Sequence, residues 1–363
     1  MSQSSVSALR AVFMGTPAFA AKILSTVLDS SSTSVIAVYT QPDRPSGRGK
    51  QLKASEVKLL ALERGLPVFQ PEHFKSGEEG DAAVAGLAAL QPDVLLVAAY
   101  GLLLPQRVLD IPSRMPINVH TSLLPKYRGA APIQRSIMNR DSFTGVTVMR
   151  MEAALDSGPI LLQKAVGIDI NDTSASLHDE LAVVGGMLLV DALSRLAGGT
   201  LKAIEQDASR ASYAAKLSKE EAALDLCLPV YELHARLRGL SPWPGGMLTL
   251  RRTGHDDLVV AVVPGRYPLT GPLPDTVDDS RFANTPGKES SRPGDIFLAA
   301  PLQRGASSED AAAPPEDALL VRCGDGWYAF PELRPAGKKS MSGRAFFNGY
   351  LKDSLDARFA TPD

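Results

Sequence analysis

The chain of 363 residues has little cysteine, no long hydrophobic run and no excess of charge of either sign. Its two cysteines cannot form a disulfide framework or a cysteine-based zinc site. The longest apolar run, residues 94–104, has about half of the ~20 residues that a membrane span needs. The 38 Lys and Arg residues nearly balance the 40 Asp and Glu residues, which excludes a wholly basic nucleic-acid coat protein but permits a local basic patch. We therefore expect a soluble cytoplasmic protein that does not bind a membrane.

Common cofactor motifs are also missing. The turn after the first predicted strand has one glycine, Gly15, where a dinucleotide site needs G-x-G-x-x-G. A phosphate-binding Walker A loop is excluded at Gly287-Lys288, because Glu289 follows in place of Ser or Thr. The five histidines do not have the spacing of metal ligands. We therefore expect neither NAD nor a metal in this protein.

Short apolar runs alternate with helical stretches over residues 1–205, which favours an α/β fold with a Rossmann-like, doubly wound sheet. Strands are predicted at residues 10–15, 34–39, 93–100, 117–120, 144–151 and 159–166, and helices at 17–28 and 174–196.

A different pattern follows a predicted linker at residues 206–221. A helix is predicted at 220–240, interrupted at Pro229, and short strands are predicted at 247–250, 258–263, 295–298, 318–322 and 327–330. Five short strands with turn signals favour a C-terminal domain, residues 222–363, that is a β-barrel of the oligonucleotide-binding (OB) type. The proline-rich and acidic residues 264–317 are predicted to form long insertions in the loops of this barrel.

Three polar residues near the predicted sheet edge are candidates for catalysis. Asn118 and His120 end a predicted strand, and residues i and i+2 share a strand face, so both point toward the crevice above the sheet. Asp156 lies in a predicted turn and can return to the same crevice. An amide, an imidazole and a carboxylate suit direct acyl transfer to an amine, since they can stabilise an oxyanion and move a proton. Taken singly, such residues are more often a cap, a structural histidine and a turn former.

Longer strings surround these residues. They are Phe13-Met-Gly-Thr-Pro17, Gln41-Pro-Asp-Arg-Pro-Ser-Gly-Arg-Gly49, Asn118-Val-His-Thr-Ser-Leu-Leu-Pro125, Arg128-Gly-Ala-Ala-Pro-Ile-Gln134, Thr144-Gly-Val-Thr147, Leu155-Asp-Ser-Gly158, Lys216-Leu-Ser-Lys-Glu-Glu221, Pro242-Trp-Pro244 and Leu333-Arg-Pro-Ala-Gly-Lys-Lys339. Over residues 10 to 250 and 318 to 345 the chain thereby resembles the 10-formyltetrahydrofolate-dependent formyltransferase family. Within that family it is most similar to members that act on initiator methionyl-tRNA.

The resemblance implies roles for individual residues. It implies that Asn118, His120 and Asp156 are catalytic, and that Ser122, Leu123, Leu124 and Pro125 line the site for the co-substrate 10-formyltetrahydrofolate. The implied reaction moves the formyl group to the α-amine of methionine on initiator tRNA, for translation initiation. Residues 1–205 would be the catalytic domain and residues 222–363 the tRNA-binding domain, and we expect a monomer.

Two basic segments favour a tRNA substrate. Residues 41–53 hold four cations against one acid, Asp43, and their Pro and Gly residues predict a flexible loop directly after the second strand. Residues 334–344 hold four cations and no acid. A solvated charged loop is the common alternative for either segment. The predicted tRNA contacts are Arg44, Arg48, Lys50, Lys216, Lys219, Lys338 and Lys339.

The same residues are compatible with two other functions. A small-molecule formyltransferase, with the barrel used for oligomerisation, would act on glycinamide ribonucleotide or a nucleotide aminosugar and ignore tRNA. A non-catalytic folate or RNA binder would bind folate without turnover, with Asn118 and His120 as structural residues.

Overall fold

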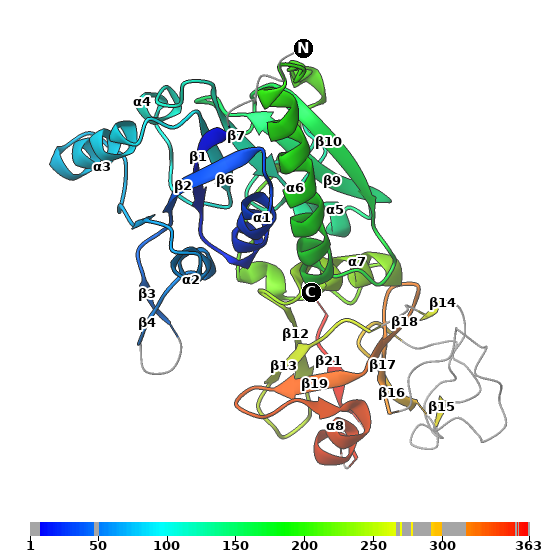
Figure 1. Ribbon diagram of the computed structural model, residues 1–363. Helices are drawn as coiled ribbons and strands as arrows, with labels where there is room; N and C mark the ends of the chain where they lie inside the picture. Colours follow the sequence, from blue (N-terminus) through cyan, green and yellow to red (C-terminus); the bar gives the residue numbers. More distant parts are fainter. Residues whose placement is uncertain are drawn as a thin grey trace. The chain divides into compact units, whose positions relative to one another are not determined.

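The computed structural model describes residues 8–46, 51–265, 269–270, 277–278, 292–299, 317–352, 354 and 356–361 (Figure 1). Two compact units make up the chain. Unit 1 comprises Met1–Ile133, Phe143–Gly167 and Ser176–Ala215, and unit 2 comprises Gln134–Ser142, Ile168–Ala175 and Lys216–Asp363. The domain boundaries predicted from the sequence stay a proposal. Arg48, Lys50 and most of the predicted insertions at 264–317 lie outside the described residues.

A seven-stranded sheet with the order β10-β9-β7-β6-β1-β2-β5 forms the centre of unit 1 (Figure 1). The chain leaves β1 for β2 on one side and later returns to β6 on the other side of β1. Ligands of open α/β sheets usually bind at such a reversal, outside the carboxyl ends of the strands. The strands are β1 (Leu9–Gly15), β2 (Thr33–Tyr39), β5 (Val68–Phe69), β6 (Val94–Ala98) and β7 (Met115–His120), which are parallel, and β9 (Phe143–Arg150) and β10 (Ile160–Gly167), which are antiparallel.

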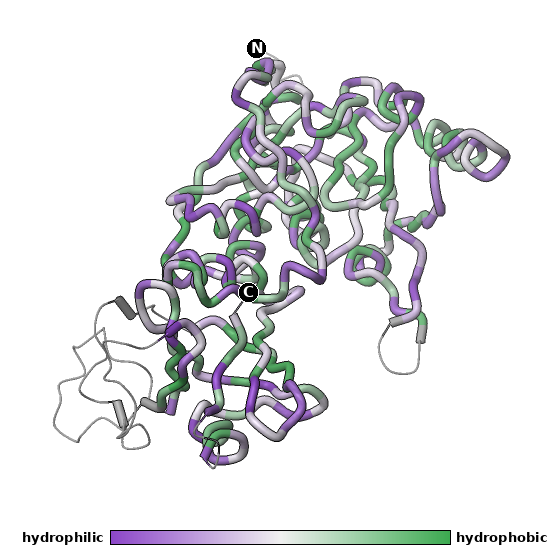
Figure 2. Tube along the Cα trace, turned by 180° about the vertical axis from the view of Figure 1, so that it is seen from behind, coloured by the Kyte–Doolittle hydropathy of each residue, from purple (hydrophilic) through white to green (hydrophobic). Residues whose placement is uncertain are grey.

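Helices cover both faces of this sheet, which explains why its parallel strands are apolar on both sides. Helices α1 (Ala18–Leu28) and α6 (Ser174–Ala197) share one face, where Gly185 of α6 meets Val119 of β7 and Ile23 of α1. Helices α3 (Glu78–Ala89) and α4 (Gln106–Leu109) flank the other face. Figure 2 shows hydrophobic residues along the strands between these layers. The hydrophobic core on the side of α3 and α4 contains Val12, Met14, Ala37, Tyr39, Phe74, Leu87, Leu95, Val97, Tyr100, Leu104, Val108 and Leu109.

Short elements complete unit 1. Helix α2 (Glu56–Glu63) follows a hairpin formed by β3 (Arg44–Ser46) and β4 (Gln51–Lys53). The sequence predicts a loop over residues 41–53, and this prediction is wrong in part because residues 44–46 and 51–53 are paired strands. Pro45 fits opposite Leu52 because the hairpin is a separate two-stranded sheet, and a proline is tolerated on such edges. A second small sheet pairs β8 (Arg128–Gly129) with β11 (Tyr213–Ala214), in parallel.

Unit 2 contains two antiparallel sheets of five strands, with the orders β20-β19-β13-β12-β21 and β14-β18-β17-β16-β15. Phe297 packs edge-on against the buried Trp327, and the Arg322 guanidinium lies 5.5 Å above that indole. The strands are β12 (Gly246–Arg251), β13 (Leu258–Val262), β14 (Leu269–Thr270), β15 (Val277–Asp278), β16 (Ile296–Ala299), β17 (Leu319–Arg322), β18 (Gly326–Phe330), β19 (Glu332–Pro335), β20 (Met341–Ser342) and β21 (Arg358–Phe359).

The described residues of unit 2 include α7 (Val230–Leu240), α8 (Gly343–Tyr350) and most of α5 (Pro132–Met138). The predicted helix at 220–240 is wrong in its first half, because only residues 220–222 form a short 3₁₀ turn before α7. Pro229 is the physical reason, since proline lacks an N–H and fits a helix only at its start. The Asp325 side chain accepts a hydrogen bond from the Val230 N–H at 2.7 Å and so caps the start of α7.

Candidate active site

Strand β7 carries two of the predicted catalytic residues at the carboxyl edge of the sheet. Val119 faces α6, so its neighbours Asn118 and His120 lie on the opposite face. Asn118 pairs in register with Val97 of β6, which belongs to the hydrophobic core on the side of α3 and α4. His120 ends the strand. The structure thus brings the amide and the imidazole together beside the reversal of strand order.

The His120 imidazole is held by one backbone carbonyl. It is 7 % exposed, and its Nε2 lies 2.9 Å from the carbonyl oxygen of Tyr127. A carbonyl can only accept, so Nε2 carries the hydrogen and the neutral ring has its lone pair on Nδ1. Tyr127 has a left-handed backbone, φ 62°, and its own N–H donates to Ser212 Oγ at 2.9 Å. This loop therefore leaves Nδ1 as the nitrogen that can accept a proton.

Asp156 faces that nitrogen from the turn between β9 and β10. Its Oδ2 lies 3.7 Å from His120 Nδ1, which is too long for a hydrogen bond, so the two groups interact electrostatically. The same oxygen accepts the Gly129 N–H at 2.8 Å. Asp156 has a φ of 48°, a left-handed conformation that costs a non-glycine residue about 1–2 kcal/mol. The surrounding contacts must offset that cost.

Gly129 can make this contact because it is a glycine. Its φ is 112°, and a Cβ at this position would lie 2.9 Å from the Ala214 carbonyl oxygen. The close pairing of β8 with β11 and the direction of the Gly129 N–H therefore both require glycine here.

The Asn118 side chain is available to a ligand. It is half-buried, and within the described part of the chain its amide has no hydrogen-bond partner. An amide N–H in this position can donate to an oxyanion formed beside His120.

The loop after β7 includes the predicted folate residues Ser122, Leu123, Leu124 and Pro125. Thr147 Oγ1 donates to the Ser122 carbonyl at 2.6 Å and accepts the Leu124 N–H at 3.1 Å. Gln163 Nε2 donates to Thr147 Oγ1 at 2.9 Å and to the Leu124 carbonyl at 2.8 Å. The Thr147 hydroxyl thus uses its one donor and both acceptor positions. The Leu124–Pro125 peptide is cis. These bonds fix the backbone of the loop beside His120.

An apolar side chain stands at the same sheet edge. Leu103, in the loop after β6, is 80 % exposed. Because β6 and β7 are parallel neighbours, the loops that follow them emerge at one edge of the sheet. Leu103 therefore lies at the same sheet edge as the loop Ser122–Pro125. Sequence reasoning missed Leu103, because an exposed leucine cannot be told from a buried one within an apolar run.

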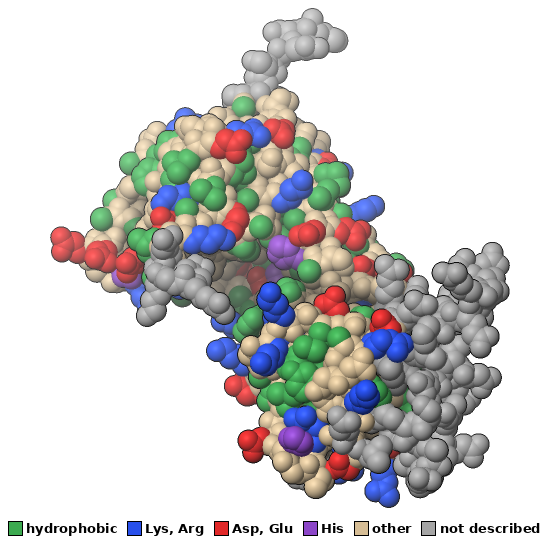
Figure 3. All heavy atoms as spheres, turned by 90° about the horizontal axis from the view of Figure 1, so that it is seen from below, with side chains coloured by type: hydrophobic (Ala, Val, Ile, Leu, Met, Phe, Trp, Pro, Cys, Tyr) green, Lys and Arg blue, Asp and Glu red, His purple; other side chains and the backbone are tan. Residues whose placement is uncertain are grey.

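The predicted tRNA contacts belong to both units. Arg44 lies on the hairpin of unit 1, is exposed, and has no ion-pair partner among the described residues. Lys216, Lys219, Lys338 and Lys339 are exposed in unit 2. Figure 3 shows Lys and Arg side chains dispersed over the visible face of each unit.

The acid of the hairpin segment is neutralised internally. Asp43 accepts hydrogen bonds from Lys58 Nζ at 2.6 Å and from Gln70 Nε2 at 2.8 Å. The hydrogen bond from Lys58, followed by that from Gln70, lowers the pKa of Asp43 below its usual value. The base of the hairpin is therefore tied to unit 1, and Asp43 does not oppose the charge of Arg44 at full strength.

No group of three or more His, Cys, Asp and Glu side chains among the described residues is arranged to hold a metal ion. Within the same residues, no helix has the length and hydrophobicity to span a membrane.

The comparisons with known proteins agree with this architecture. The family described as "Formyl transferase" matches residues 9–193, and "Formyl transferase, C-terminal domain" matches residues 296–351. A methionyl-tRNA formyltransferase of Nitratidesulfovibrio vulgaris (strain DP4) is 46 % identical over 343 residues, which are 94 % of this chain and 93 % of that protein. One of Pseudomonas paraeruginosa (strain DSM 24068 / PA7) is 43 % identical over 340 residues, 94 % of this chain and 96 % of that protein.

A solved structure shares the fold. HypX from Aquifex aeolicus, in complex with tetrahydrofolic acid, superposes with a TM-score of 0.57 at 15 % identity and covers 96 % of this chain, which spans 48 % of HypX. At this identity the likeness shows the fold alone. The chain belongs to the formyl transferase family. The predicted family, transferase class and fold class are thereby confirmed.

Sequence reasoning missed the residues that support the candidate site. They are Tyr127 and Gly129, which act through backbone groups, and Thr147, Gln163, Arg128 and Gln206, which act through side chains. Some lie in the strings quoted for the resemblance, but their partners are distant in sequence. A role that depends on a distant partner leaves no local pattern.

Proposed function

We propose that this chain transfers the formyl group of 10-formyltetrahydrofolate to the α-amine of methionine on initiator tRNA, giving formylmethionyl-tRNA and tetrahydrofolate. The observation that carries the proposal is the meeting of Asn118, His120 and Asp156 at one sheet edge. It is supported by methionyl-tRNA formyltransferases that are 46 % and 43 % identical over 94 % of the chain.

The folate co-substrate fits the residues present. HypX has been solved with tetrahydrofolic acid, which supports a folate site in this fold. The fixed loop Ser122–Pro125 offers the apolar Leu123, and Leu103 offers a second apolar surface. When bound, the co-substrate supplies the formyl carbon that the amine attacks and the nitrogen that leaves.

His120 and Asp156 would move the proton that this reaction releases. The amine must lose a proton as its bond to carbon forms, and the leaving nitrogen must gain one. His120 Nδ1 is the free acceptor, since Nε2 is engaged by Tyr127. A positive imidazole would face the Asp156 carboxylate at 3.7 Å, where the gross Coulomb attraction is roughly 4 kcal/mol at an effective dielectric constant of 20. The pair can therefore take the proton from the amine and return it to the leaving nitrogen.

Asn118 would stabilise the negative oxygen of the tetrahedral intermediate. Its unengaged amide lies two residues from His120 on one strand face, so the amide and the protonated imidazole can donate to one oxygen. No serine or cysteine nucleophile is needed, because the formyl group passes directly from one nitrogen to the other.

The tRNA would bind through the basic residues of both units. Arg44, with Arg48 and Lys50 of the same segment, would contact the acceptor end, and Lys216, Lys219, Lys338 and Lys339 would contact phosphates elsewhere. We further propose that residues 206–221 are a linker to a tRNA-binding domain, and that the enzyme is a cytoplasmic monomer that uses neither NAD nor a metal.

One assay tests this function against the small-substrate alternative. The purified protein is incubated with 10-formyltetrahydrofolate and methionyl-initiator tRNA, and the deacylated product is analysed for formylmethionine. Parallel reactions contain glycinamide ribonucleotide, a nucleotide-linked aminosugar or methionyl elongator tRNA. We expect formylation of the initiator tRNA alone. Formylation of a small amine without formylation of tRNA would refute the proposal.

A further inference from the structure

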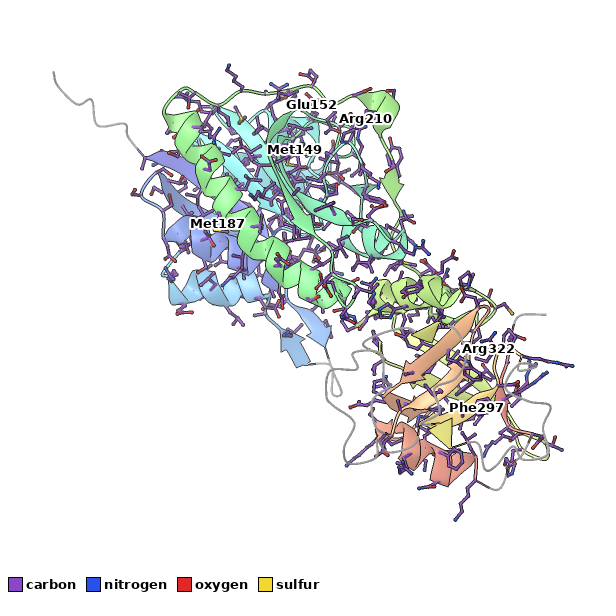
Figure 4. The ribbon with its side chains drawn as sticks, turned by 90° about the vertical axis from the view of Figure 1, so that its right-hand side faces the viewer. Met149, Glu152, Met187, Arg210, Phe297 and Arg322 are labelled. Atoms are coloured by element: carbon purple, nitrogen blue, oxygen red, sulfur yellow. The ribbon has the colours of Figure 1, made fainter. Side chains whose placement is uncertain are left out.

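Gln206 joins the two segments that hold the catalytic carboxylate. Its Nε2 donates to the carbonyl oxygen of Asp156 at 2.9 Å and to that of Gly158 at 2.7 Å. Its Oε1 accepts from Arg128 Nη2 at 2.8 Å and from Arg128 Nε at 3.1 Å. The amide thus uses both donors and both acceptor positions. Figure 4 labels Glu152, in the turn after β9 that holds Asp156, and Arg210, in the stretch before β11 that carries Gln206.

Arg128 extends this connection to the histidine. It stands in the chain between Tyr127, whose carbonyl accepts from His120, and Gly129, whose N–H holds Asp156. Arg128 is 7 % exposed, so the position of its guanidinium is fixed by its partners rather than by solvent. One amide therefore connects the backbone of the acid with the loop that orients both catalytic side chains.

The backbone of Gln206 is itself anchored. Ile204, two residues earlier, exchanges two hydrogen bonds with Ile160 at the start of β10, at 2.8 and 2.9 Å. The amide can therefore restrain the Asp156 turn, which needs restraint because Asp156 is left-handed. Without the two bonds to the carbonyls, the turn can relax toward an ordinary conformation and withdraw the carboxylate from His120.

We propose that Gln206 is a positioning residue that holds Asp156 in its left-handed conformation against His120. The inference rests on the proposed function, in which these two side chains move the proton. Gln206 itself contacts neither substrate nor the reacting atoms.

The first test compares kcat with KM in two substitutions. Gln206→Ala removes all four hydrogen bonds. Gln206→Glu keeps an acceptor for Arg128 but sets a carboxylate against the carbonyls of Asp156 and Gly158. We expect kcat to fall about 10- to 100-fold in each, as for a misplaced catalytic group, with KM for folate and tRNA within about twofold of the unsubstituted enzyme.

Two matched controls accompany these variants. Glu205→Ala changes the exposed neighbour in the same segment and should leave kcat and KM unchanged. Gln163→Ala removes a glutamine of the same kind that holds the Leu124 loop, so it should raise KM for folate more than it lowers kcat. A fall in kcat in Gln206→Ala and a rise in KM for folate in Gln163→Ala would distinguish positioning of Asp156 from support of the folate loop.

The decisive measurement is a double-mutant cycle with Asp156→Ala. If Gln206 acts through the carboxylate, Gln206→Ala should lower kcat in the normal background and have no further effect once Asp156 is alanine. An equal loss in both backgrounds would identify a general scaffold role and overturn the inference, as would an unchanged kcat in Gln206→Ala. Should the alanine variant fail to fold by circular dichroism, the same cycle is run with Gln206→Glu.

Failure of this inference differs from failure of the proposed function. If the unsubstituted enzyme does not formylate initiator tRNA, or if Asp156→Ala is fully active, the proposed function fails. If both of those results are as expected and Gln206→Ala behaves like Glu205→Ala, only the role of Gln206 is refuted.

Discussion

A buried histidine of unit 2 should make the stability of the protein sensitive to mild acid. His234 is fully buried on α7, where its Nε2 lies 2.7 Å from the Ile170 carbonyl oxygen and its Nδ1 lies 2.8 Å from Tyr328 Oη. The Ile170 carbonyl can only accept, so Nε2 carries the hydrogen and Nδ1 accepts from the Tyr328 hydroxyl, which itself accepts the Gly265 N–H at 3.0 Å. The neutral ring is thus fully satisfied, and a second proton on it would leave the hydroxyl hydrogen without its acceptor.

The magnitude follows from the shift in pKa. Burial, with the nearby Arg238 charge as a second cause, lowers the pKa of His234 from 6.5 to about 4. The folded state therefore binds fewer protons than the unfolded state between these values, and stability falls as pH decreases from 6.5 to about 4. At roughly 1.4 kcal/mol per pH unit, the full loss is about 3 kcal/mol, a large part of the stability of most domains.

Tryptophan fluorescence can follow this loss directly. The chain has two tryptophans, and Trp243 and Trp327 both belong to unit 2. Urea unfolding is measured at pH 7.5 and pH 4.5 for the unsubstituted protein and for His234→Gln, whose side chain does not titrate. We expect the unsubstituted protein to lose about 2.5 kcal/mol more than the variant between these pH values.

A control separates this histidine from the other titrating groups. His178 is half-exposed on α6, so His178→Gln should keep the pH dependence of the unsubstituted protein. If His234→Gln also keeps that dependence, the reasoning from burial and hydrogen bonding is refuted, whatever the absolute stability of the variant.

Three predictions concern the proposed activity. Asn118→Ala should lower kcat by about 10²–10³ with KM for folate unchanged, as for the loss of one oxyanion donor, and normal steady-state kinetics would remove Asn118 from that role. Arg44→Ala should raise KM for methionyl-tRNA and flatten the slope of log affinity against log salt by up to about one unit. Arg64→Ala, which breaks a surface pair with Asp29, is the control and should keep the slope, and an unchanged slope in Arg44→Ala would argue against a phosphate contact. Lys58→Met should remove the partner of Asp43 at the base of the hairpin, and so raise KM for tRNA while KM for folate stays constant. Equal changes in the two KM values would contradict this local effect.

Much of the fold could be predicted because short, mostly apolar segments that alternate with helical stretches are typical of a doubly wound parallel sheet. Strands predicted at 10–15, 34–39 and 117–120 are observed at 9–15, 33–39 and 115–120. Helix α3 was not predicted. Its sequence has few large apolar residues, and Gly80 and Leu87 are its buried positions, so little periodicity marks it.

The candidate site could likewise be predicted only in part from the sequence. Asn118 and His120 could be placed together from the sequence, because their spacing of two within one strand fixes a shared face. The distance from His120 to Asp156 could not be predicted, because it depends on a left-handed turn and on the Gly129 N–H, 27 residues from Asp156. Family resemblance assigned the carboxylate, and the fold supplies the physical reason for its position.

The support of Asp156 also explains why a non-glycine residue can remain left-handed there. The conformation costs about 1–2 kcal/mol, whereas each hydrogen bond contributes a net of roughly 1 kcal/mol, so one contact alone would barely offset it. The turn receives three: the carboxylate accepts from Gly129, and the carbonyls of Asp156 and Gly158 accept from Gln206. Gly129 and Gln206 come from separate segments that are joined through Arg128. A substitution at either residue should therefore weaken the contact that the other makes with the Asp156 turn. The geometry of Asp156 therefore depends on the whole hydrogen-bond network rather than on any single contact.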